Sequence, residues 1–273
     1  MLIEIIKSCI LGIIQGITEW LPISSTGHLI LINRFLNLNC SESFWSLYEV
    51  VIQLGSIFAV VVLYFNKLNP FSPKKTSAQK KSTWNMWFKV IAGSVPVAVI
   101  GMKFNDYIPD HPLVIAAALI IYGILFIVIE KINRAPKTKT IEEMSYAKSV
   151  GIGLFQTLSI IPGTSRSGST IMGGIILGTS RKIAAEYSFF LAIPAMVGAS
   201  LLRVYKYIKE CGLVFSATEL CVLISGMLVA FVVSIIAIKF LMDYIKKHDF
   251  TVFGYYRIIL GIIVILYAAT IGF

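Results

Sequence analysis

The sequence predicts an all-α integral membrane protein built from two inverted repeats. The composition is the first observation: 57% of the 273 residues are hydrophobic, 14% are charged and the mean hydropathy is +0.82, whereas an ordinary soluble domain carries about 25% charged residues. The second is a set of apolar runs that reach the length of a bilayer crossing. The third is a pair of polar turns containing proline, one in each half. Together they predict six transmembrane helices plus two re-entrant helical hairpins that meet near the midplane.

The first predicted element is a re-entrant hairpin within residues 1–36. It consists of two apolar runs, residues 2–18 and 23–35. Each run is too short for a comfortable crossing, and Pro22 lies near their junction, where its missing amide donor ends a helix. Ser24 or Ser25 can then cap the second helix with a side-chain oxygen. The chain begins without a basic region or a small-residue cleavage site, so we expect no removable signal peptide.

Three transmembrane helices are expected after this hairpin and three more after its counterpart. We place them at residues 44–65, 84–105 and 113–130 in the first half, and at 187–207, 219–241 and 252–272 in the second. A short acidic turn, residues 106–112, joins the second and third helices. The first repeat is assigned to residues 1–135 and the second to residues 136–273, and both form one membrane domain.

The second half repeats the plan of the first and begins with a hairpin at residues 148–180. Its turn carries the sequence PGTSRSGST, and Pro22 and Ser25 correspond to Pro162 and Ser165 at a shift of 140 residues. An odd number of crossings in each half inverts the second copy relative to the first. The two hairpins are therefore expected to enter the membrane from opposite faces.

The basic residues predict the orientation. The chain has 24 Lys and Arg against 14 Asp and Glu, a net charge of +10, and the excess gathers in residues 66–89 and 131–148. Because cytoplasmic loops are enriched in Lys and Arg, we expect both segments in the cytoplasm and both termini in the periplasm, although Lys206 and Lys209 depart from this rule. The charge thus indicates topology and no nucleic-acid partner. The four cysteines lack metal-ligand spacing.

The second polar turn has the character of an anion site. Helix N-termini favour negative charge through their free amides and their dipoles. Arg166, between Ser165 and Ser167, adds a planar fork that suits phosphate oxygens and is permanently charged. If the two turns oppose each other, both helix N-termini point at one anion.

The first polar turn adds groups for chemistry. Gln15 and Glu19 are four residues apart and share one helical face, and His28 follows Pro22 by six residues. With Arg166, these residues supply the carboxylate, hydroxyls, imidazole and guanidinium that phosphoryl transfer requires. They are therefore candidates for catalysis.

Each candidate also has a structural interpretation. His28 could be a buried histidine satisfied by hydrogen bonds, Glu19 could only pair with Arg166, and serines beside a proline often only satisfy backbone groups. Two related polar turns in so apolar a chain make a purely structural explanation of the whole set the weaker one. Glu49 and Gln53, also four residues apart, could face the site or a metal ion.

The two turns also resemble the signatures of a known family. QGITEWLPISSTGH resembles the first signature of the bacterial undecaprenyl-diphosphate phosphatase family, also called the bacitracin-resistance protein family, and PGTSRSGST resembles the second. YEVVIQLGSIFAVVV is similar to the family's next helix, so the resemblance covers nearly the whole chain. It implies a multi-pass enzyme of the bacterial cytoplasmic (inner) membrane. Such an enzyme hydrolyses undecaprenyl diphosphate to undecaprenyl phosphate and inorganic phosphate, which recycles the lipid carrier of peptidoglycan synthesis. The resemblance further implies an inverted-repeat fold and a site that faces the periplasm.

The resemblance also assigns roles to residues. The family's catalytic carboxylate falls on Glu19, its serine on Ser25, its histidine on His28 and its arginine on Arg166. Gln15 stands where a second glutamate is common in the family. A single carboxylate remains compatible with a divalent cation, Mg²⁺ or Ca²⁺, with Glu19 as its protein ligand. Six further residues are expected to bind the substrate: Gln15, Ser24, Thr26, Ser165, Ser167 and Thr170.

The expected mechanism places Ser25 as the nucleophile on the terminal phosphorus, with His28 as its base. Glu19 binds a metal or orients His28, and Arg166 holds the polyprenyl diphosphate. Direct attack by His28 is the alternative. The rival function is a lipid or anion transporter or flippase, because opposed broken helices also bind transported ions, and a third is a lipid-binding scaffold. The set of serine, histidine and arginine favours the enzyme, since transport needs no nucleophile and base.

Overall fold

The computed structural model describes residues 1–104, 111–132, 135–212 and 215–271. These residues form eleven α-helices and one 3₁₀ turn, Leu158–Ile160. The first half contains α1 (Leu2–Thr18), α2 (Ser25–Leu36), α3 (Glu42–Leu63), α4 (Phe65–Leu68), α5 (Ser77–Phe104) and α6 (Pro112–Ile132). The second half contains α7 (Tyr146–Thr157), α8 (Arg166–Ile176), α9 (Arg181–Cys211), α10 (Ala217–Tyr244) and α11 (Thr251–Ile271).

Six helices in the described part of the chain are long and apolar enough to cross a membrane: α3, α5, α6, α9, α10 and α11. Their number and order confirm the prediction of a multi-pass, all-α membrane protein. All six helices begin before the predicted residue, by one or two residues except for α5, which begins seven residues earlier at Ser77 (84 − 77), and α9, which begins six earlier at Arg181 (187 − 181). A helix continues beyond its apolar run until a cap ends it. For α9 that cap is Ser180, whose hydroxyl accepts from the amide of Ile183. Residues 105–110, with most of the predicted acidic turn, and residue 272 lie outside the described residues.

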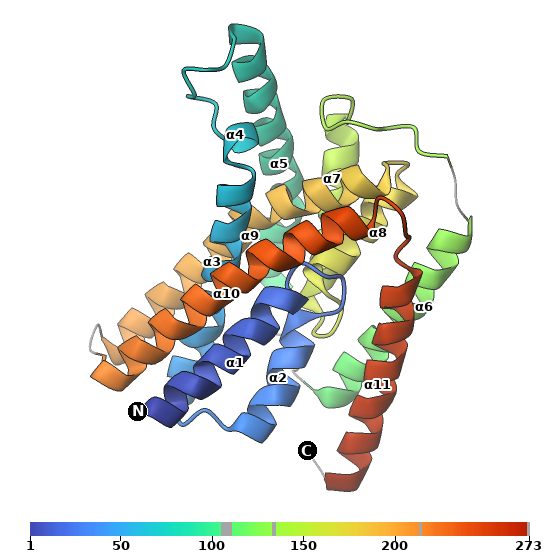
Figure 1. Cartoon of the computed structure of the whole chain (residues 1–273). Coiled ribbons are helices and arrows are strands. Elements are labelled where there is room, and N and C mark those ends of the chain that lie inside the picture. The colour runs from blue at the N-terminus through green and yellow to red at the C-terminus, as the bar shows by residue number, and fades with distance from the viewer. Residues whose placement is uncertain (105–110, 133–134, 213–214, 272–273) are drawn as a thin grey trace.

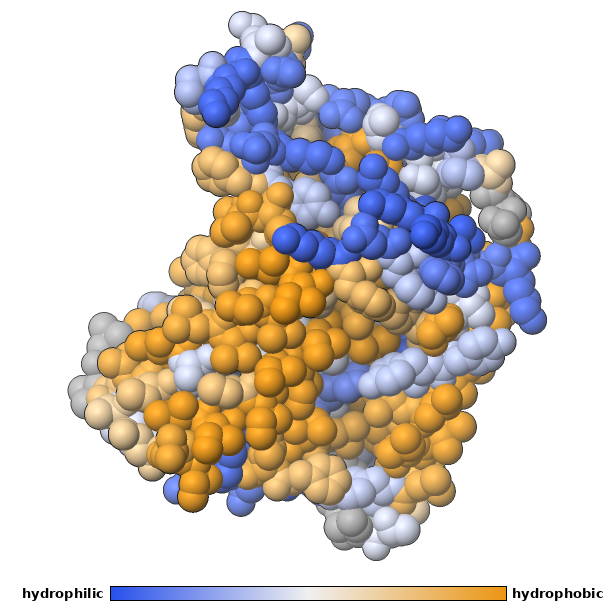
Figure 2. All heavy atoms as spheres, in the orientation of Figure 1, coloured by the Kyte–Doolittle hydropathy of each residue, from blue (hydrophilic) through white to orange (hydrophobic). Residues whose placement is uncertain are grey.

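The surface divides into an apolar belt and a hydrophilic end (Figure 2). Large exposed hydrophobic side chains on the predicted spans include Leu201, Ile236 and Leu266. The two basic connections, between α4 and α5 and between α6 and α7, lie at the same end of the molecule, whereas α1 begins and α11 ends at the opposite end (Figure 1). An apolar belt of this kind fits a protein whose solvent is the bilayer.

Helices of the first half of the chain pack against helices of the second half. α1 packs along α10, and α7 packs along α5, while α3 lies against α9 and α6 against α11. Glycines allow the closest approaches: an added Cβ at Gly12 would strike the Gly226 carbonyl of α10, and one at Gly153 would strike the Gly93 carbonyl of α5. Small residues let helix backbones approach closely where lipid provides no hydrophobic drive for association. These contacts between the halves bring the two helix breaks together inside the protein.

The two helix breaks share one backbone geometry. Ser24 caps α2 by accepting from the amide of Gly27, and Ser165 caps α8 by accepting from the amide of Gly168. Their φ angles are 74° and 72°, which is costly for a residue with a side chain and is typical of functional sites. Of the two predicted caps of α2, Ser24 is therefore the one that caps the helix. It matches Ser165 at a shift of 141 residues (165 − 24), whereas the two prolines match at a shift of 140 (162 − 22). The shift differs because the second turn has one more residue between its proline and its cap.

Candidate functional site

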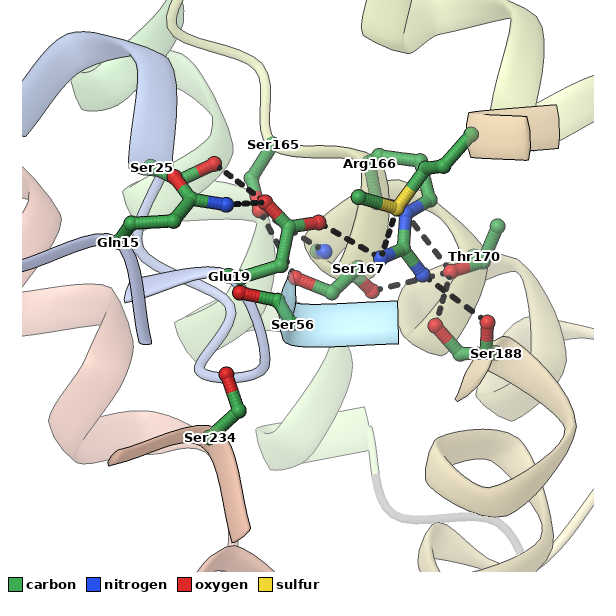
Figure 3. A network of polar contacts seen from close by, with 12 residues as sticks. Gln15, Glu19, Ser25, Ser56, Ser165, Arg166, Ser167, Thr170, Ser188 and Ser234 are labelled. Carbon is green, nitrogen blue, oxygen red and sulfur yellow. Dashed lines mark hydrogen bonds and ion pairs between the residues drawn. The ribbon is translucent and has the colours of Figure 1, made fainter. Parts of the chain in front are cut away.

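The turns that precede α2 and α8 lie in contact inside the protein (Figure 3). Glu19 belongs to the first turn, and its Oε1 accepts from Nη2 of Arg166, the first residue of α8, at 2.7 Å. Ser167 also donates from its hydroxyl to the Leu21 carbonyl at 3.3 Å. The two polar stretches singled out in the sequence are therefore joined directly by an ion pair and a hydrogen bond.

Glu19 is the centre of the polar network. The residue is only 6% exposed. Its Oε2 accepts from Nε2 of Gln15 at 3.0 Å and from the Ser25 hydroxyl at 2.8 Å, while its Oε1 binds Arg166. A buried carboxylate is stable only when its charge is paired and its lone pairs are hydrogen-bonded. Glu19 thus holds Ser25 with the hydroxyl proton directed at the carboxylate.

Arg166 is held on several sides. Its Nη1 donates to the Ser188 carbonyl of α9 at 3.0 Å, its Nη2 lies 3.4 Å from the Met196 sulfur, and its guanidinium carbon lies 5.5 Å from the centre of the Trp20 ring. The Nε atom is buried and has no partner among the described residues. The guanidinium is therefore fixed in position by Glu19 and α9.

The remaining predicted hydroxyls form the N-terminal turn of α8 and its surroundings. Ser165 and Ser167 share a hydrogen bond of 3.2 Å, and Thr170 binds the Ser188 hydroxyl at 2.6 Å and the Arg166 carbonyl at 2.9 Å. Thr26 is half-buried in the first turn of α2. Ser165, Ser167 and Thr170 thus order the first turn of α8, on which Arg166 lies.

His28 has different partners from those predicted. Its Nδ1 lies 2.7 Å from the Ser24 carbonyl, and its Nε2 lies 2.6 Å from the Tyr256 hydroxyl of α11. Among the hydrogen bonds of the described residues, none joins His28 to Ser25. The prediction that His28 is the base for Ser25 is therefore not met in this geometry, because Ser25 faces the preceding turn whereas His28 faces α11.

Two residues of α11 were missed by the sequence analysis, Tyr256 and Arg257. Arg257 is 0% exposed and donates to three carbonyls: Nη1 to Pro22 at 3.1 Å, and Nη2 to Gly163 at 2.8 Å and Thr164 at 2.9 Å. It thereby bonds both turns, and no carboxylate neutralises it within the described residues. An arginine inside an otherwise apolar helix was the signal that could have revealed it.

The charges of the site sum to a positive value. Glu19 cancels Arg166, and the Arg257 cation remains, so these three ionised groups carry a net charge of +1. A buried positive charge beside two capped helix N-termini favours an anionic ligand. Glu49, in contrast, pairs with Arg203 of α9 at 3.3 Å.

The residues present offer a partial site for a divalent cation. In the described part of the chain, no three His, Cys, Asp or Glu side chains are grouped so that they could hold a metal. The buried Oε1 of Gln15, however, has no partner among those residues and lies on the side chain that donates to Glu19. Amide and carboxylate oxygens suit Mg²⁺ and Ca²⁺, and Mg²⁺ commonly takes its other ligands from water and substrate phosphates. The pair therefore fits a cation that arrives with a phosphate ligand.

Comparison with known proteins gives a match over nearly the whole chain. The family model described as bacitracin resistance protein BacA matches residues 8–263. An undecaprenyl-diphosphatase of Enterococcus faecalis is 56% identical over 266 residues, which is 96% of each chain. One from Acetivibrio thermocellus is 55% identical over 271 residues, covering 97% of this chain and 98% of its own. Undecaprenyl-diphosphatase 1 of Clostridioides difficile is 56% identical over 269 residues, 97% of each chain.

Proposed function

Since this chain belongs to the bacitracin resistance protein BacA family, we propose that it is an enzyme that hydrolyses undecaprenyl diphosphate to undecaprenyl phosphate and inorganic phosphate. The observation that carries the proposal is the buried network in which the Ser25 hydroxyl donates to Glu19 while Arg166 binds the same carboxylate. These three residues can serve as nucleophile, proton acceptor and phosphate-binding cation, which supports the proposal. The reaction recycles the lipid carrier of peptidoglycan synthesis and so gives resistance to bacitracin.

The first step is attack by the Ser25 oxygen on the terminal phosphorus. The hydroxyl proton passes to the Glu19 oxygen that already accepts its hydrogen bond. The bond between this phosphorus and the bridging oxygen breaks, and undecaprenyl phosphate leaves with the electron pair. A phosphorylated Ser25 remains. An adjacent base of this kind is the usual means of activating a serine.

Proton transfer also changes the charge around Arg166. When Glu19 accepts the proton it becomes neutral, so the guanidinium that was paired with it can bind the phosphoryl oxygens. Charge on these oxygens is spread in the transition state, and fixed positive groups stabilise it without reorganisation. Thr170 positions Arg166 by donating to its backbone carbonyl, and Ser188 does so by accepting from its guanidinium.

Water completes the reaction by attacking the phosphoserine. Glu19 returns its proton to the departing Ser25 oxygen, and the proton of the water passes to the His28 imidazole and then to solvent. In this assignment His28 takes its proton from the water and not from Ser25. That agrees with the contacts of His28, which are to the Ser24 carbonyl and the Tyr256 hydroxyl. Direct attack by His28 is the competing mechanism, and it would leave the phosphate on the imidazole.

Phosphate release by the detergent-purified protein tests the function. We expect inorganic phosphate to appear from a polyprenyl diphosphate without any membrane gradient. A transporter would need a gradient or a second compartment, whereas a hydrolase needs neither. If no phosphate appears with Mg²⁺ or Ca²⁺, the enzymatic function is wrong and a transport role for the same anion site is favoured.

Gln15 and Glu19 are the residues that would hold a divalent cation, which would neutralise charge on the bound diphosphate. In Gln15→Glu a second carboxylate replaces the amide that lies 3.0 Å from Glu19. We expect the Mg²⁺ concentration that gives half the maximal rate to fall in this variant, because two adjacent carboxylates attract a cation more strongly. The titration should be unchanged in Gln79→Glu, the control at the exposed start of α5. A rate that is independent of divalent cations in both variants would exclude the cation.

The inverted repeat is supported by three features of the fold. Helices of residues 1–135 pack against helices of residues 136–273. At both breaks a serine with positive φ caps the following helix, with φ of 74° at Ser24 and 72° at Ser165. The basic connections also share one end of the molecule (Figure 1). In the proposed topology, both hairpins, residues 1–36 and 148–180, are re-entrant, the basic segments face the cytoplasm, and the catalytic site opens to the periplasm.

Cysteine labelling tests the topology. In a variant without the four native cysteines, Ala78→Cys lies at the exposed start of α5 and Asn39→Cys lies at the opposite end, between α2 and α3. An impermeant thiol reagent applied to intact cells should label position 39 and leave position 78 unlabelled until the cells are permeabilised. Labelling of position 78 alone in intact cells would reverse the orientation.

A further inference from the structure

Tyr256 makes the contact that determines what His28 can do. The Tyr256 hydroxyl lies 2.6 Å from Nε2 of His28, and the two rings are stacked with centroids 5.7 Å apart and planes inclined by 7°. The residues are on α11 and α2, which lie in different halves of the chain. The contact is therefore specific in both distance and ring orientation.

The partners of the imidazole determine which nitrogen carries the proton. Nδ1 lies 2.7 Å from the Ser24 carbonyl, which can only accept, so Nδ1 must carry a hydrogen. In the neutral imidazole the free lone pair is then on Nε2. The Tyr256 hydroxyl must donate to this lone pair, and its own oxygen keeps lone pairs that can accept another proton.

This arrangement covers the only basic nitrogen of neutral His28. A water molecule cannot give its proton to Nε2 directly while Tyr256 occupies that lone pair. It can give the proton to the Tyr256 oxygen while Tyr256 passes its own proton to Nε2. Tyr256 is 42% exposed, whereas its neighbour Arg257 is buried against both turns of the site, so Tyr256 lies at the edge of the site.

We propose that Tyr256 is a proton relay between the attacking water and His28. This proposal rests on the proposed function, because it names the residue that serves the hydrolysis of the phosphoserine. As the water oxygen bonds to phosphorus, one water proton moves to the Tyr256 oxygen and the Tyr256 proton moves to Nε2. The imidazolium then returns the Nε2 proton to the Tyr256 oxygen while Tyr256 releases its own proton to solvent, which restores the starting hydrogen bonds.

Other charged groups near His28 do not replace this relay. Arg257, one residue away on α11, is a permanent cation and directs its donors to carbonyls of both turns. Glu19 is occupied by Gln15, Ser25 and Arg166. The Tyr256 hydroxyl is the hydrogen-bond partner that Nε2 has among the described residues.

Removing the hydroxyl alone tests the relay. Tyr256→Phe keeps the ring and should lower kcat about tenfold or more, within the range by which general acid–base groups act, while KM for the lipid changes less than about twofold. Tyr255→Phe, at the exposed neighbouring position, is the control and should leave kcat unchanged. If Tyr256 acts through His28, adding Tyr256→Phe to His28→Ala should have no further effect. Unchanged kcat in Tyr256→Phe, or an equal fall in both backgrounds, would overturn the proposal.

A spectroscopic measurement decides the matter even where the His28→Ala rate is too low to compare. In protein labelled with ¹⁵N-histidine, the Nε2 resonance of His28 should be that of an unprotonated nitrogen accepting a hydrogen bond, and it should move in Tyr256→Phe but not in Tyr255→Phe. An unmoved resonance contradicts the relay. Failure of wild-type protein to release phosphate would instead contradict the proposed function, so the two failures are distinct.

Discussion

Replacing Glu19 by glutamine should lower kcat for phosphate release by about 10²- to 10⁴-fold, the usual contribution of a general base. The amide oxygen can still accept from Arg166, and the new amide nitrogen can donate to Oε1 of Gln15 once the Gln15 amide, which now presents Nε2, turns round. The fold should therefore survive while the acceptor of the Ser25 proton is lost. The measurement is steady-state phosphate release, with the thermal midpoint recorded for the same preparations.

Glu130 provides a matched control for this variant. It is also 6% exposed and is held by an arginine, since Nε of Arg181 donates to both of its oxygens at 3.0 Å. Glu130→Gln thus makes the same change in a buried ion pair that is outside the candidate site, and it should leave kcat within about twofold. Equal losses of kcat in the two variants would show that Glu19 contributes only to the stability of the fold.

Arg166→Lys should lower kcat by about 10²- to 10³-fold, the cost of removing one donor to transition-state charge. The guanidinium makes directed bonds to Glu19 and Ser188 at once and can turn one edge to phosphoryl oxygens. An ammonium is a point charge that cannot keep this geometry. We expect the lipid to bind nearly as before, because its apolar chain is unaffected, and the loss to appear in kcat measured by phosphate release.

Arg181→Lys is the corresponding control, because Arg181 also binds a buried carboxylate. Its turnover should stay close to that of the wild type once the folded fraction is taken into account. An Arg166→Lys protein that is folded and hydrolyses at the wild-type rate would reduce Arg166 to a structural partner of Glu19.

Much of the fold was predictable because the bilayer imposes simple requirements. The six spans followed from long apolar runs with few charged residues, and all six are present as helices in the described part of the chain. The helix breaks followed from proline and hydroxyl residues, and Ser24 and Ser165 are their caps. These features depend on local sequence, so reading along the chain was sufficient to find them.

The partners within the site were less predictable because they depend on distant elements. The family resemblance led us to expect His28 as the base for Ser25, yet Ser25 binds Glu19 and His28 binds Tyr256 of α11. Local spacing could not show this, since it depends on how α11 packs against the first hairpin. Arg257 likewise became a site residue only through carbonyls of two turns far away in sequence.

The site of covalent phosphorylation tests the central claim most directly. Purified protein mixed with polyprenyl diphosphate should be quenched within one turnover, in acid and in parallel in alkali so that both phosphoserine and phosphohistidine survive. Peptide mapping should place the phosphate on Ser25, and Ser25→Ala should carry none. Phosphate on His28, in wild type or in Ser25→Ala, would contradict the assignment of Ser25 as nucleophile and of Glu19 as its base.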